Sequence, residues 1–155
     1  MTMPPTAFIT MLLPAAQATH RATGIPASLI LAQAALESGW GARAPGCNLF
    51  GIKPGPKWKG PVTLVTTHEV IKGVRTQVTD KFRAYKDWAE CMVDHANFLK
   101  VNPRYVLCFR EKTGEGWARA VAKAGYATDP NYADLLISIM RGRNMSQYDN
   151  LKGMP

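Results

Sequence analysis

The first residue whose position suggests chemistry is Glu37, which stands at the end of a predicted helix. The helix is expected over residues 27–38, because Pro26 suits a first helical turn and Gly39 suits a C-terminal cap. A carboxylate in the last turn faces the negative end of the helix dipole, which disfavours ionisation and raises the pKa. Desolvation by an apolar neighbour such as Trp40 would raise it further. Glu37 is therefore a candidate general acid, although a Glu before a capping Gly is also typical of solvated surface.

A long motif surrounds this glutamate. Residues 32–53, AQAALESGWGARAPGCNLFGIK, closely resemble the core motif of glycoside hydrolase family 73, the glucosaminidase domains of bacterial autolysins and flagellar peptidoglycan hydrolases. Residues 66–85 resemble the cleft-side hairpin of that family, which ends in FRxY, and residues 124–133, AGYATDPNYA, are similar to its GYATDPxYA motif. The resemblance covers about residues 26–136 and implies that Glu37 is the catalytic acid of a glycosidase.

The same resemblance assigns roles to two further residues. Glu69 occupies the place of the second acidic residue of the family, and Tyr126 that of a substrate-positioning tyrosine near the acid. Glycosidases normally use two carboxyl groups, one that donates a proton and one that activates water or attacks the sugar. Glu69 is the candidate base, with solvated strand surface as its alternative. Asp80 is a nearby substitute, whereas Asp87 is better explained as a helix cap.

The stereochemical outcome is left open by the sequence. If Glu69 lies across a cleft from Glu37, a wide separation would favour direct attack by water with inversion, while closure could shorten the distance. The N-acetyl group of the substrate could instead act as an internal nucleophile. Three mechanisms therefore remain compatible with the same acid.

Aromatic side chains are suited to sugar binding, because C–H groups pack on the ring while polar tips bond the hydroxyls. The candidates are Trp40, Phe50, Trp58, Tyr126 and Tyr132, each with core packing as the alternative. Asn48 could bond an acetamido group or could equally stabilise a turn. By the resemblance, residues 48–53 border the cleft.

The elements that must position these residues are mostly helical. Residues 6–18 are predicted as a first amphipathic helix and not as a signal peptide, since no basic segment precedes them and Pro14 interrupts the apolar stretch. The other predicted elements are a loop at 41–60, strands at 62–71 and 74–85, and helices between Asp87 and Asn102, at 117–124 and at 129–142. The tail, residues 143–155, is assigned no element.

Helices that flank one hairpin indicate an α+β protein dominated by α. The resemblance implies a lysozyme-like fold with a helical core and one β-hairpin lobe beside the catalytic cleft. At this length, residues 1–155 are interpreted as a single catalytic domain.

Charge and composition limit the class of partner. Nineteen Lys and Arg against eleven Asp and Glu give a net charge of +8, which favours a polyanionic partner. The basic residues are scattered and no nucleic-acid motif is present, so cell wall ranks ahead of nucleic acid. No segment approaches the roughly 20 apolar residues that span a bilayer. Cys47, Cys91 and Cys108 are either free thiols or include one disulfide, the three histidines are scattered, and we predict no metal and no cofactor.

The resulting hypothesis is a monomeric peptidoglycan hydrolase that cleaves the β-1,4 bond between N-acetylglucosamine and N-acetylmuramic acid. The alternatives are a muramidase or lytic transglycosylase, and a non-catalytic wall-binding module. Because no ordinary signal peptide is recognised, we expect delivery to the periplasm or cell wall by a type VI secretion system, as an antibacterial effector, or by holin-type release, as a phage lysin. An effector would imply a cognate immunity protein that plugs the cleft.

Overall fold

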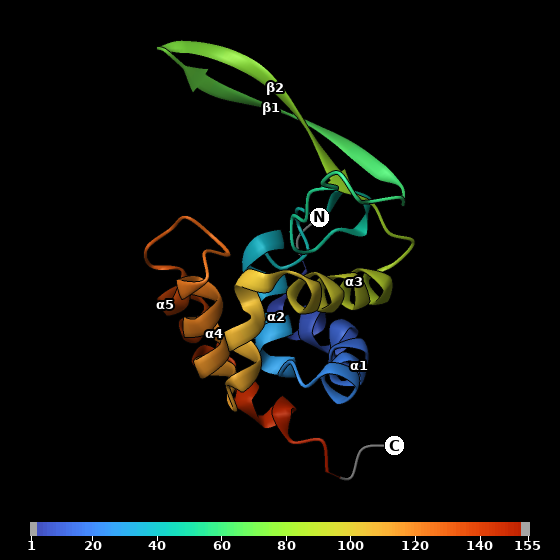
Figure 1. The fold of residues 1–155 in the computed structure, drawn as a ribbon, viewed down its shortest axis with the longest axis vertical. Helices are drawn as coiled ribbons and strands as arrows, with labels where there is room; N and C mark the ends of the chain where they lie inside the picture. The colour runs from blue at the N-terminus through green and yellow to red at the C-terminus, as the bar shows by residue number, and fades with distance from the viewer. Residues whose placement is uncertain (1–2, 153–155) are drawn as a thin grey trace.

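The computed structural model describes residues 3–152, which form a helical body from which one β-hairpin projects (Figure 1). The helices are α1 (Pro5–Thr23), α2 (Ala27–Ser38), α3 (Trp88–Val101), α4 (Gly114–Lys123) and α5 (Tyr132–Gly142). Strands β1 (Val62–Ile71) and β2 (Val74–Arg83) make the hairpin, and short 3-10 helices occur at η1 (Pro45–Cys47), η2 (Pro103–Arg110) and η3 (Met145–Asp149). The predicted α+β class, mainly helical, is confirmed.

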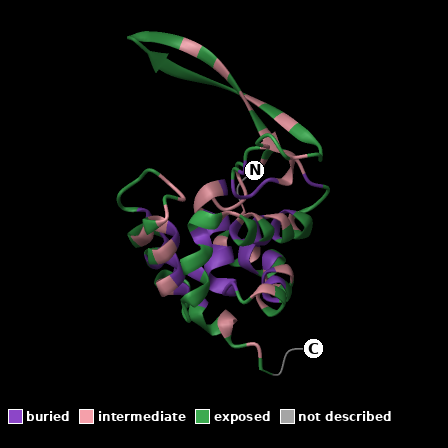
Figure 2. Ribbon diagram, viewed as in Figure 1, coloured by how far each residue is buried: buried purple, intermediate pink, exposed green. Residues whose placement is uncertain are grey.

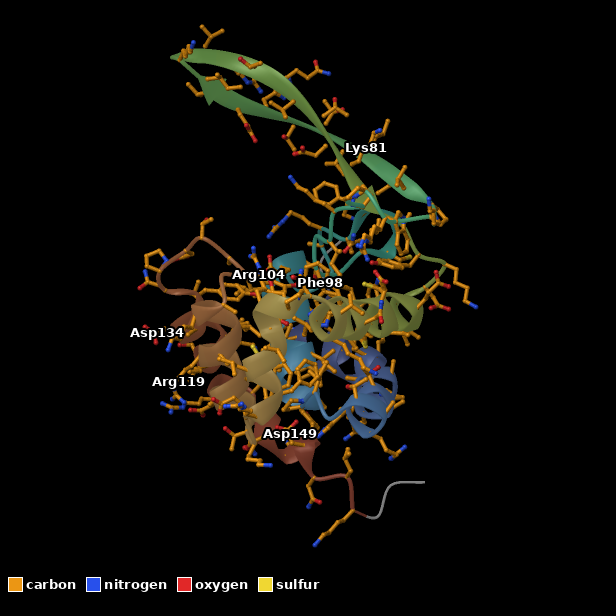
Figure 3. All side chains as sticks on the ribbon, in the orientation of Figure 1. Lys81, Phe98, Arg104, Arg119, Asp134 and Asp149 are labelled. Atoms are coloured by element: carbon orange, nitrogen blue, oxygen red, sulfur yellow. The ribbon has the colours of Figure 1, made fainter. Side chains whose placement is uncertain are left out.

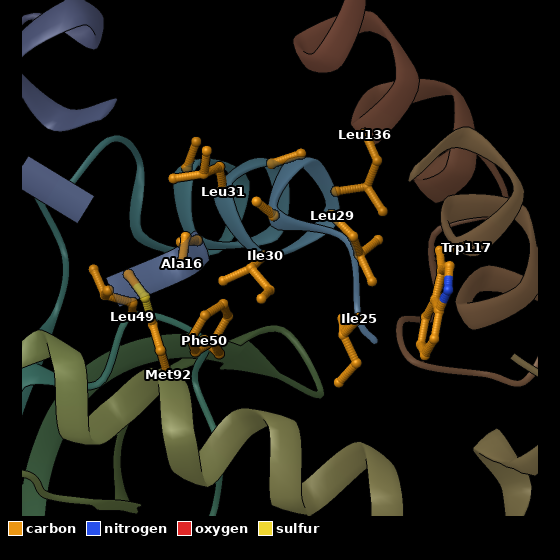
Figure 4. Packing of buried hydrophobic residues seen from close by; sticks show 14 of the residues in the cluster. Ala16, Ile25, Leu29, Ile30, Leu31, Leu49, Phe50, Met92, Trp117 and Leu136 are labelled. Carbon is orange, nitrogen blue, oxygen red and sulfur yellow. The ribbon is translucent and has the colours of Figure 1, made fainter. Parts of the chain in front are cut away.

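Helix α2 runs through the centre of the body. All its residues from Ala27 to Ala35 are buried, and α1, α4 and α5 pack against it (Figure 2). Leu29 points toward Trp117, while Ile30 points toward Phe50 (Figure 4). A helix that is apolar on all sides belongs inside a core, and each such aliphatic side chain contributes about 1.5–3 kcal/mol on burial. The end of α2, where Glu37 lies, is therefore held firmly.

The hairpin contrasts with this helix in its exposure. Its strands pair without interruption from Val62 opposite Arg83 to Ile71 opposite Val74. Lys72 and Gly73 both have positive φ, at 50° and 78°, as the tight turns that match strand twist require. The Leu64 side chain is 62% exposed. Among the described residues no second layer covers the outer part of the hairpin (Figures 1 and 2).

The root of the hairpin is tied to the loop that precedes it. The backbone N–H groups of Arg83 and Tyr85 donate to the carbonyls of Ile52 and Gly46, at 3.0 and 2.8 Å. A Cβ on Gly46 would lie 2.9 Å from the Cβ of Ala84, so only glycine allows this close approach. The predicted irregular loop at 41–60 therefore acts as a base for the hairpin.

Two boundaries in the N-terminal half differ from the predicted ones. The helix predicted at 6–18 runs from Pro5 to Thr23, because Pro14 lies on the exposed side, where the carbonyl that loses its N–H partner is open to water. The second strand ends at Arg83 instead of residue 85, where pairing with β1 gives way to the loop contacts.

Boundaries in the C-terminal half also differ from prediction. Helix α4 starts at Gly114, since the Thr113 side chain accepts from the backbone of Gly116 and caps the helix earlier than expected. Helix α5 starts at Tyr132 and not at 129, because the Asp129 carboxylate accepts from the backbone of Asn131 in a turn before it. The 3-10 helices η2 and η3 were not predicted, and residues 153–155 of the tail lie outside the described part of the chain.

Candidate functional site

Three consecutive residues with positive φ end α2 directly after Ser38. Gly39, Trp40 and Gly41 have φ values of 58°, 58° and 89°. The left-handed conformation is costly for a residue with a Cβ, so the Trp40 backbone must be held by packing. Its ring lies edge-on to Phe8, with centroids 5.6 Å apart. This turn makes Glu37 a last-turn residue, as predicted.

The carboxyl group of Glu37 is half-buried and is bonded by one tyrosine. The hydroxyl of Tyr132, in α5, donates to Oε2 of Glu37 at 2.8 Å. Burial raises the pKa of Glu37 above its ordinary value, and the hydrogen bond from Tyr132 lowers it by a smaller amount. The net direction is upward, which favours the protonated form that a general acid requires.

Behind Tyr132 lies a buried group of polar and aromatic residues. Gln33 donates from Nε2 to the Tyr132 hydroxyl at 3.1 Å, and its Oε1 lies 2.9 Å from Nε2 of His95. The His95 ring stacks on Phe50, with centroids 3.8 Å apart, and burial lowers the pKa of His95 to about 3. His95 is therefore neutral near pH 7, and the carboxyl of Glu37 is supported by side chains from three helices.

A cleft of about 580 Å³ opens beside Glu37, between the helical body and the root of the hairpin. Phe98 and Arg104 mark the side of the body that faces the hairpin (Figure 3). The lining residues are Glu37, Phe50, Gly51, Ile52, Lys53, Gly55, Phe82, Arg83, Phe98, Tyr105, Tyr126 and Ala127. Aromatic rings and two cations therefore surround a single carboxyl group, which suits a sugar polymer that carries carboxylates.

Tyr126 lies within this cleft, as the sequence motif implied. Its ring stacks on Tyr132, with centroids 5.7 Å apart and planes 13° apart, so it is held beside the Glu37 carboxyl. Burial raises the pKa of Tyr126 well above its ordinary value. Its hydroxyl is therefore protonated near neutral pH and can donate.

The other predicted sugar-binding residues fall in different places. Phe50 lines the cleft, but the residue is only 3% exposed and its ring packs on His95. Tyr132 lies beneath the cleft surface and contacts Glu37. Trp40 packs on the core and beside the guanidinium of Arg143, 5.7 Å from the ring centroid, and is not among the cleft-lining residues. Core and support roles thus account for most of these aromatic residues.

Asn48 uses its whole side-chain amide within the loop. Its Nδ2 donates to the carbonyls of Ile52 and Arg83, both at 2.9 Å, and its Oδ1 accepts from the backbone of Phe50 and Ile52. No donor is left for an acetamido group, so the geometry supports the turn-stabilising alternative. This amide shapes the loop that carries Phe50.

The acidic candidates on the hairpin share one face but not one position. Residues directly opposite in an antiparallel pair point to the same side, so Glu69, Asp80 and Phe82 lie on the face that begins at the cleft. Phe82 lines the cleft, and Asp80 reaches Lys53 at 3.9 Å. Glu69, opposite Thr76, is exposed. The rise per residue places it roughly 20 Å from Phe82 along the strands. The structure does not bring Glu69 to Glu37. Asp87 caps α3 by accepting from the backbone of Glu90, as predicted.

Sequence reasoning missed Arg83, which connects the hairpin root to the cleft. Its guanidinium lies 3.0 Å from Asp94 and 4.6 Å from the centroid of the Trp58 ring, and it donates to the carbonyl of Lys53. Asp94 also accepts from the hydroxyl of Tyr85. The FRxY segment contained this signal, since Arg83 and Tyr85 are two residues apart and point to the same side of the chain.

A second hollow, of about 610 Å³, lies at the opposite end of α2, on the side of the body marked by Asp149 (Figure 3). Its carboxylates are already engaged. Asp149 accepts from the backbone and hydroxyl of Ser28, at 2.8 and 2.6 Å, and Glu115 accepts two hydrogen bonds from Arg141. It therefore lacks a free acid, and the cleft at Glu37 is the better candidate site.

The structure also bears on metals, thiols and membranes. Within residues 3–152, no three His, Cys, Asp or Glu side chains gather in a way that could hold a metal ion. Cys47, Cys91 and Cys108 are free thiols. None of the described helices combines the length and the apolar character that crossing a membrane demands.

Comparison with known proteins assigns this chain to a family. The model of the glucosaminidase family, described as mannosyl-glycoprotein endo-beta-N-acetylglucosaminidase, matches residues 13–145. The chain belongs to this family, in agreement with the resemblance to glycoside hydrolase family 73, and the lysozyme-like fold is confirmed.

Particular relatives are known from both sequence and structure. The chain is 44% identical over 142 residues to the peptidoglycan hydrolase FlgJ of Escherichia coli (strain K12), covering 87% of this chain and 45% of the relative. It is 35% identical over 152 residues to the exo-glucosaminidase LytG of Bacillus subtilis (strain 168), covering 93% and 53%. The chain thus spans about half the length of these curated relatives.

Among solved structures, a C-terminally truncated glycoside hydrolase domain of Salmonella typhimurium FlgJ aligns with a TM-score of 0.77 and 42% identity, covering 98% of this chain and all of that one. The catalytic domain of the autolysin Auto from Listeria monocytogenes aligns with a TM-score of 0.79 and 28% identity, covering 96% and 90%.

Proposed function

We propose that this chain hydrolyses the β-1,4 bond between N-acetylglucosamine and N-acetylmuramic acid in peptidoglycan, with Glu37 as the general acid. The observation that carries the proposal is the half-buried Glu37 carboxyl in a cleft of aromatic and cationic side chains, with its pKa raised by burial. Membership of the glucosaminidase family supports the choice of bond.

In this reaction Glu37 donates its proton to the leaving glycosidic oxygen as the bond breaks. We propose that Tyr126 positions the sugar with its hydroxyl, which is supported by its stacking on Tyr132 and its place in the cleft lining. Lys53 and Arg83 line the same cleft and complement the carboxylates of the peptide stems and lactyl groups. In this proposal the acid and Tyr126 belong to the packed body, whereas Lys53 reaches the substrate as an exposed side chain.

We further propose Glu69 as the base that activates water after the hairpin bends toward the body. Glu69 shares the face of Phe82, so a bend at the root would carry its carboxylate toward the cleft. The experiment that tests this step compares Glu69→Gln with Asp80→Asn. A loss of turnover confined to Asp80→Asn would transfer the role of base to Asp80.

A second activity has one observation in its favour. Glu37 is the only carboxylate among the residues that line the cleft in the described part of the chain. A lytic transglycosylase needs no second carboxylate, because the sugar's own hydroxyl attacks and an anhydro sugar forms. A muramidase would share the acid but leave reduced muramic acid ends after borohydride treatment.

The deciding experiment digests purified peptidoglycan, reduces the products with borohydride and identifies them by mass spectrometry. Wild type is compared with Glu37→Gln and with Glu90→Gln, a matched change at an exposed glutamate of α3. Reduced N-acetylglucosamine ends that require Glu37 but not Glu90 support the proposal. Reduced muramic acid or anhydro ends would replace the bond assignment, and binding without any product would favour a wall-binding module.

The biological setting is proposed as attack on a competitor's cell wall in the periplasm by a type VI secretion effector, with a phage lysin as the alternative. Its cognate immunity protein would fill the cleft, and the net charge of +8 favours an acidic inhibitor. Directing the chain to the periplasm of a test bacterium should cause lysis. Rescue by a small secreted protein from the adjacent gene would support an effector, and an adjacent holin gene would support a lysin.

A further inference from the structure

A hydrogen-bond chain of three consecutive hydrogen bonds connects the core of the body to the Glu37 carboxyl. Nε2 of His95, in α3, lies 2.9 Å from Oε1 of Gln33, in α2. Nε2 of Gln33 donates to the hydroxyl of Tyr132, in α5, at 3.1 Å. That hydroxyl donates to Oε2 of Glu37 at 2.8 Å.

The chemistry of the amide gives this chain a single direction. An amide oxygen only accepts and an amide nitrogen only donates, so Nε2 of His95 must carry its proton. The hydroxyl of Tyr132 accepts from Gln33, which leaves its own proton for Glu37. All three donors therefore point toward the carboxyl group.

The opposite direction is disfavoured by the other nitrogen of His95. Turning the Gln33 amide over would require an unprotonated Nε2 and a proton on Nδ1 of His95. Nδ1 is buried and has no hydrogen-bond partner among the described residues. A buried donor without an acceptor costs about 1–3 kcal/mol, and unpaired acceptors are tolerated more often. A proton on Nε2 avoids this cost.

The two residues that begin this hydrogen-bond chain, His95 and Gln33, are held by packing. His95 is fully buried, its ring stacks on Phe50 at 3.8 Å, and it meets Tyr126 edge-on at 6.2 Å. Since burial lowers the pKa of His95 to about 3, the ring stays neutral and its Nε2 proton stays in place above that pH. Gln33 is likewise fully buried in the middle of α2.

We infer that Gln33 and His95 are positioning residues which, through Tyr132, confine the acidic proton of Glu37 to Oε1. Oε2 is occupied as an acceptor, and Tyr132 is the only hydrogen-bond partner of the carboxyl within residues 3–152. Glu37 lines the cleft, so the protonated oxygen is the one left for the glycosidic oxygen. The inference rests on the proposed function, in which Glu37 is the acid.

Other titratable groups face the same carboxyl and enter the design of a test. Tyr126, Tyr105, Lys53 and Arg83 line the cleft with Glu37, and Cys91 of α3 lies close to Tyr126. None of them contacts Gln33 in the hydrogen bonds of the described residues, so a change at Gln33 acts on Glu37 through Tyr132.

The first test needs neither activity nor a variant. Nitrogen-15 NMR of the histidine rings in the wild-type chain reports the tautomer of each ring directly. His95 should be neutral with its proton on Nε2 at every pH from about 4.5 to 8. A proton on Nδ1 would reverse the chain and overturn the inference.

The second test replaces Gln33 with methionine, which keeps the length of the side chain and removes both hydrogen bonds. The matched control is Gln17→Met, because Gln17 is another buried glutamine, in α1, whose Nε2 donates to the carbonyl of Tyr148 away from the cleft. Both variants are compared with wild type in thermal unfolding, in kcat and KM on peptidoglycan fragments, and in the pH dependence of kcat.

We expect Gln33→Met to lower kcat roughly ten-fold with KM unchanged. A ten-fold change is roughly the size expected when one hydrogen bond, that of Tyr132 to Glu37, loses its fixed orientation. The high-pH limb of activity should also move upward, because a freely rotating Tyr132 hydroxyl lowers the pKa of Glu37 less. Gln17→Met should change neither.

An unchanged limb and kcat in a folded Gln33→Met would overturn the inference, and if that variant does not fold the NMR result decides. A wild type without products would overturn the proposed function alone, since the tautomer is read independently.

Discussion

The helical body and the hairpin present their carboxylates in opposite ways. Glu37 lies in the last turn of α2, which is buried from Ala27 to Ala35, and its carboxyl is supported by side chains from α2, α3 and α5. Glu69 stands on a two-stranded sheet with exposed faces, far from the cleft along the strands. The acid is thus fully arranged by folding, whereas any role of the hairpin depends on movement at its root.

In the proposed reaction the two regions therefore have different roles. A preorganised acid costs no rearrangement when the bond breaks, which is where preorganisation counts most. A mobile arm can open for a long polymer and then close over it, at the expense of a conformational step in each turnover. The following predictions test whether the two regions differ in this way.

The largest effect is expected at the acid of the body. Glu37→Gln should lower turnover about a thousand-fold, because a general acid contributes roughly 10²–10⁴ to the rate. The release of reduced sugar ends measures the loss, with Glu90→Gln as the control and circular dichroism to verify folding. Turnover within ten-fold of wild type would remove Glu37 from the role of acid.

The next largest difference is expected in the free energy of unfolding of variants in the two regions. Leu29→Ala, in the buried part of α2, should lower the free energy of unfolding by about 2–5 kcal/mol, because it leaves a cavity. Leu64→Ala, at a side chain that is 62% exposed on the hairpin, should stay within about 0.5 kcal/mol. Urea unfolding measures both, and similar losses would show that the hairpin is packed in solution.

The carboxylate of the hairpin should matter less than that of the body. Glu69→Gln should lower turnover about a hundred-fold if the arm closes and supplies the base. The control is His68→Gln, since this adjacent side chain points to the other face of β1. Full turnover in Glu69→Gln, with the Glu37 variant inactive, would leave a mechanism that needs one carboxylate.

Two histidines extend the comparison to pH. Burial lowers the pKa of His95 to about 3, below the unfolded value near 6.5, so the unfolded chain binds a proton that the native chain does not. The contribution is fully present above about pH 6.5 and falls by about 1.4 kcal/mol per pH unit on acidification toward pH 3. Burial also lowers the pKa of His20, which acts in the same direction.

The measurement is urea unfolding at several pH values. His95→Asn should flatten the slope relative to wild type, whereas His68→Gln, at an exposed position of the hairpin, should retain it. Equal slopes in wild type and His95→Asn would mean that native His95 binds its proton as readily as His95 of the unfolded chain.

The sequence could predict elements whose signals are local. Pro26 and Gly39 defined α2, the Lys72-Gly73 turn defined the hairpin, and Asp87 defined the cap of α3, because each acts within a few residues. The motif assigned Tyr126 to the cleft, where it lies. No element was predicted at 103–110, where the structure has the 3-10 helix η2, which buries Tyr105 and Cys108 and contacts α3 and α4.

The parts that could not be predicted depend on residues far apart in the chain. Nothing near Gln33 shows that it meets His95 and Tyr132, which are 62 and 99 residues away. Asn48 and Tyr132 remained candidates for sugar binding beside their structural alternatives, because residue type alone does not show that their polar atoms are bonded within the protein. Glu69 is exposed because, among the described residues, no other layer covers the hairpin. The alternating pattern of one strand does not predict whether such a layer exists.

The free edges of the hairpin bear on how the protein behaves in concentrated solution. Within residues 3–152 each strand pairs only with the other, and Val70, Ile71 and Val74 are exposed at the tip. Unpaired strand edges with apolar side chains are templates for association between copies, and charge is the usual safeguard. Lys72 and Arg75 at the tip, with the net charge of +8, supply that safeguard through repulsion that salt screens. Solubility should therefore fall as ionic strength rises, with the arms as the first surfaces to stick together.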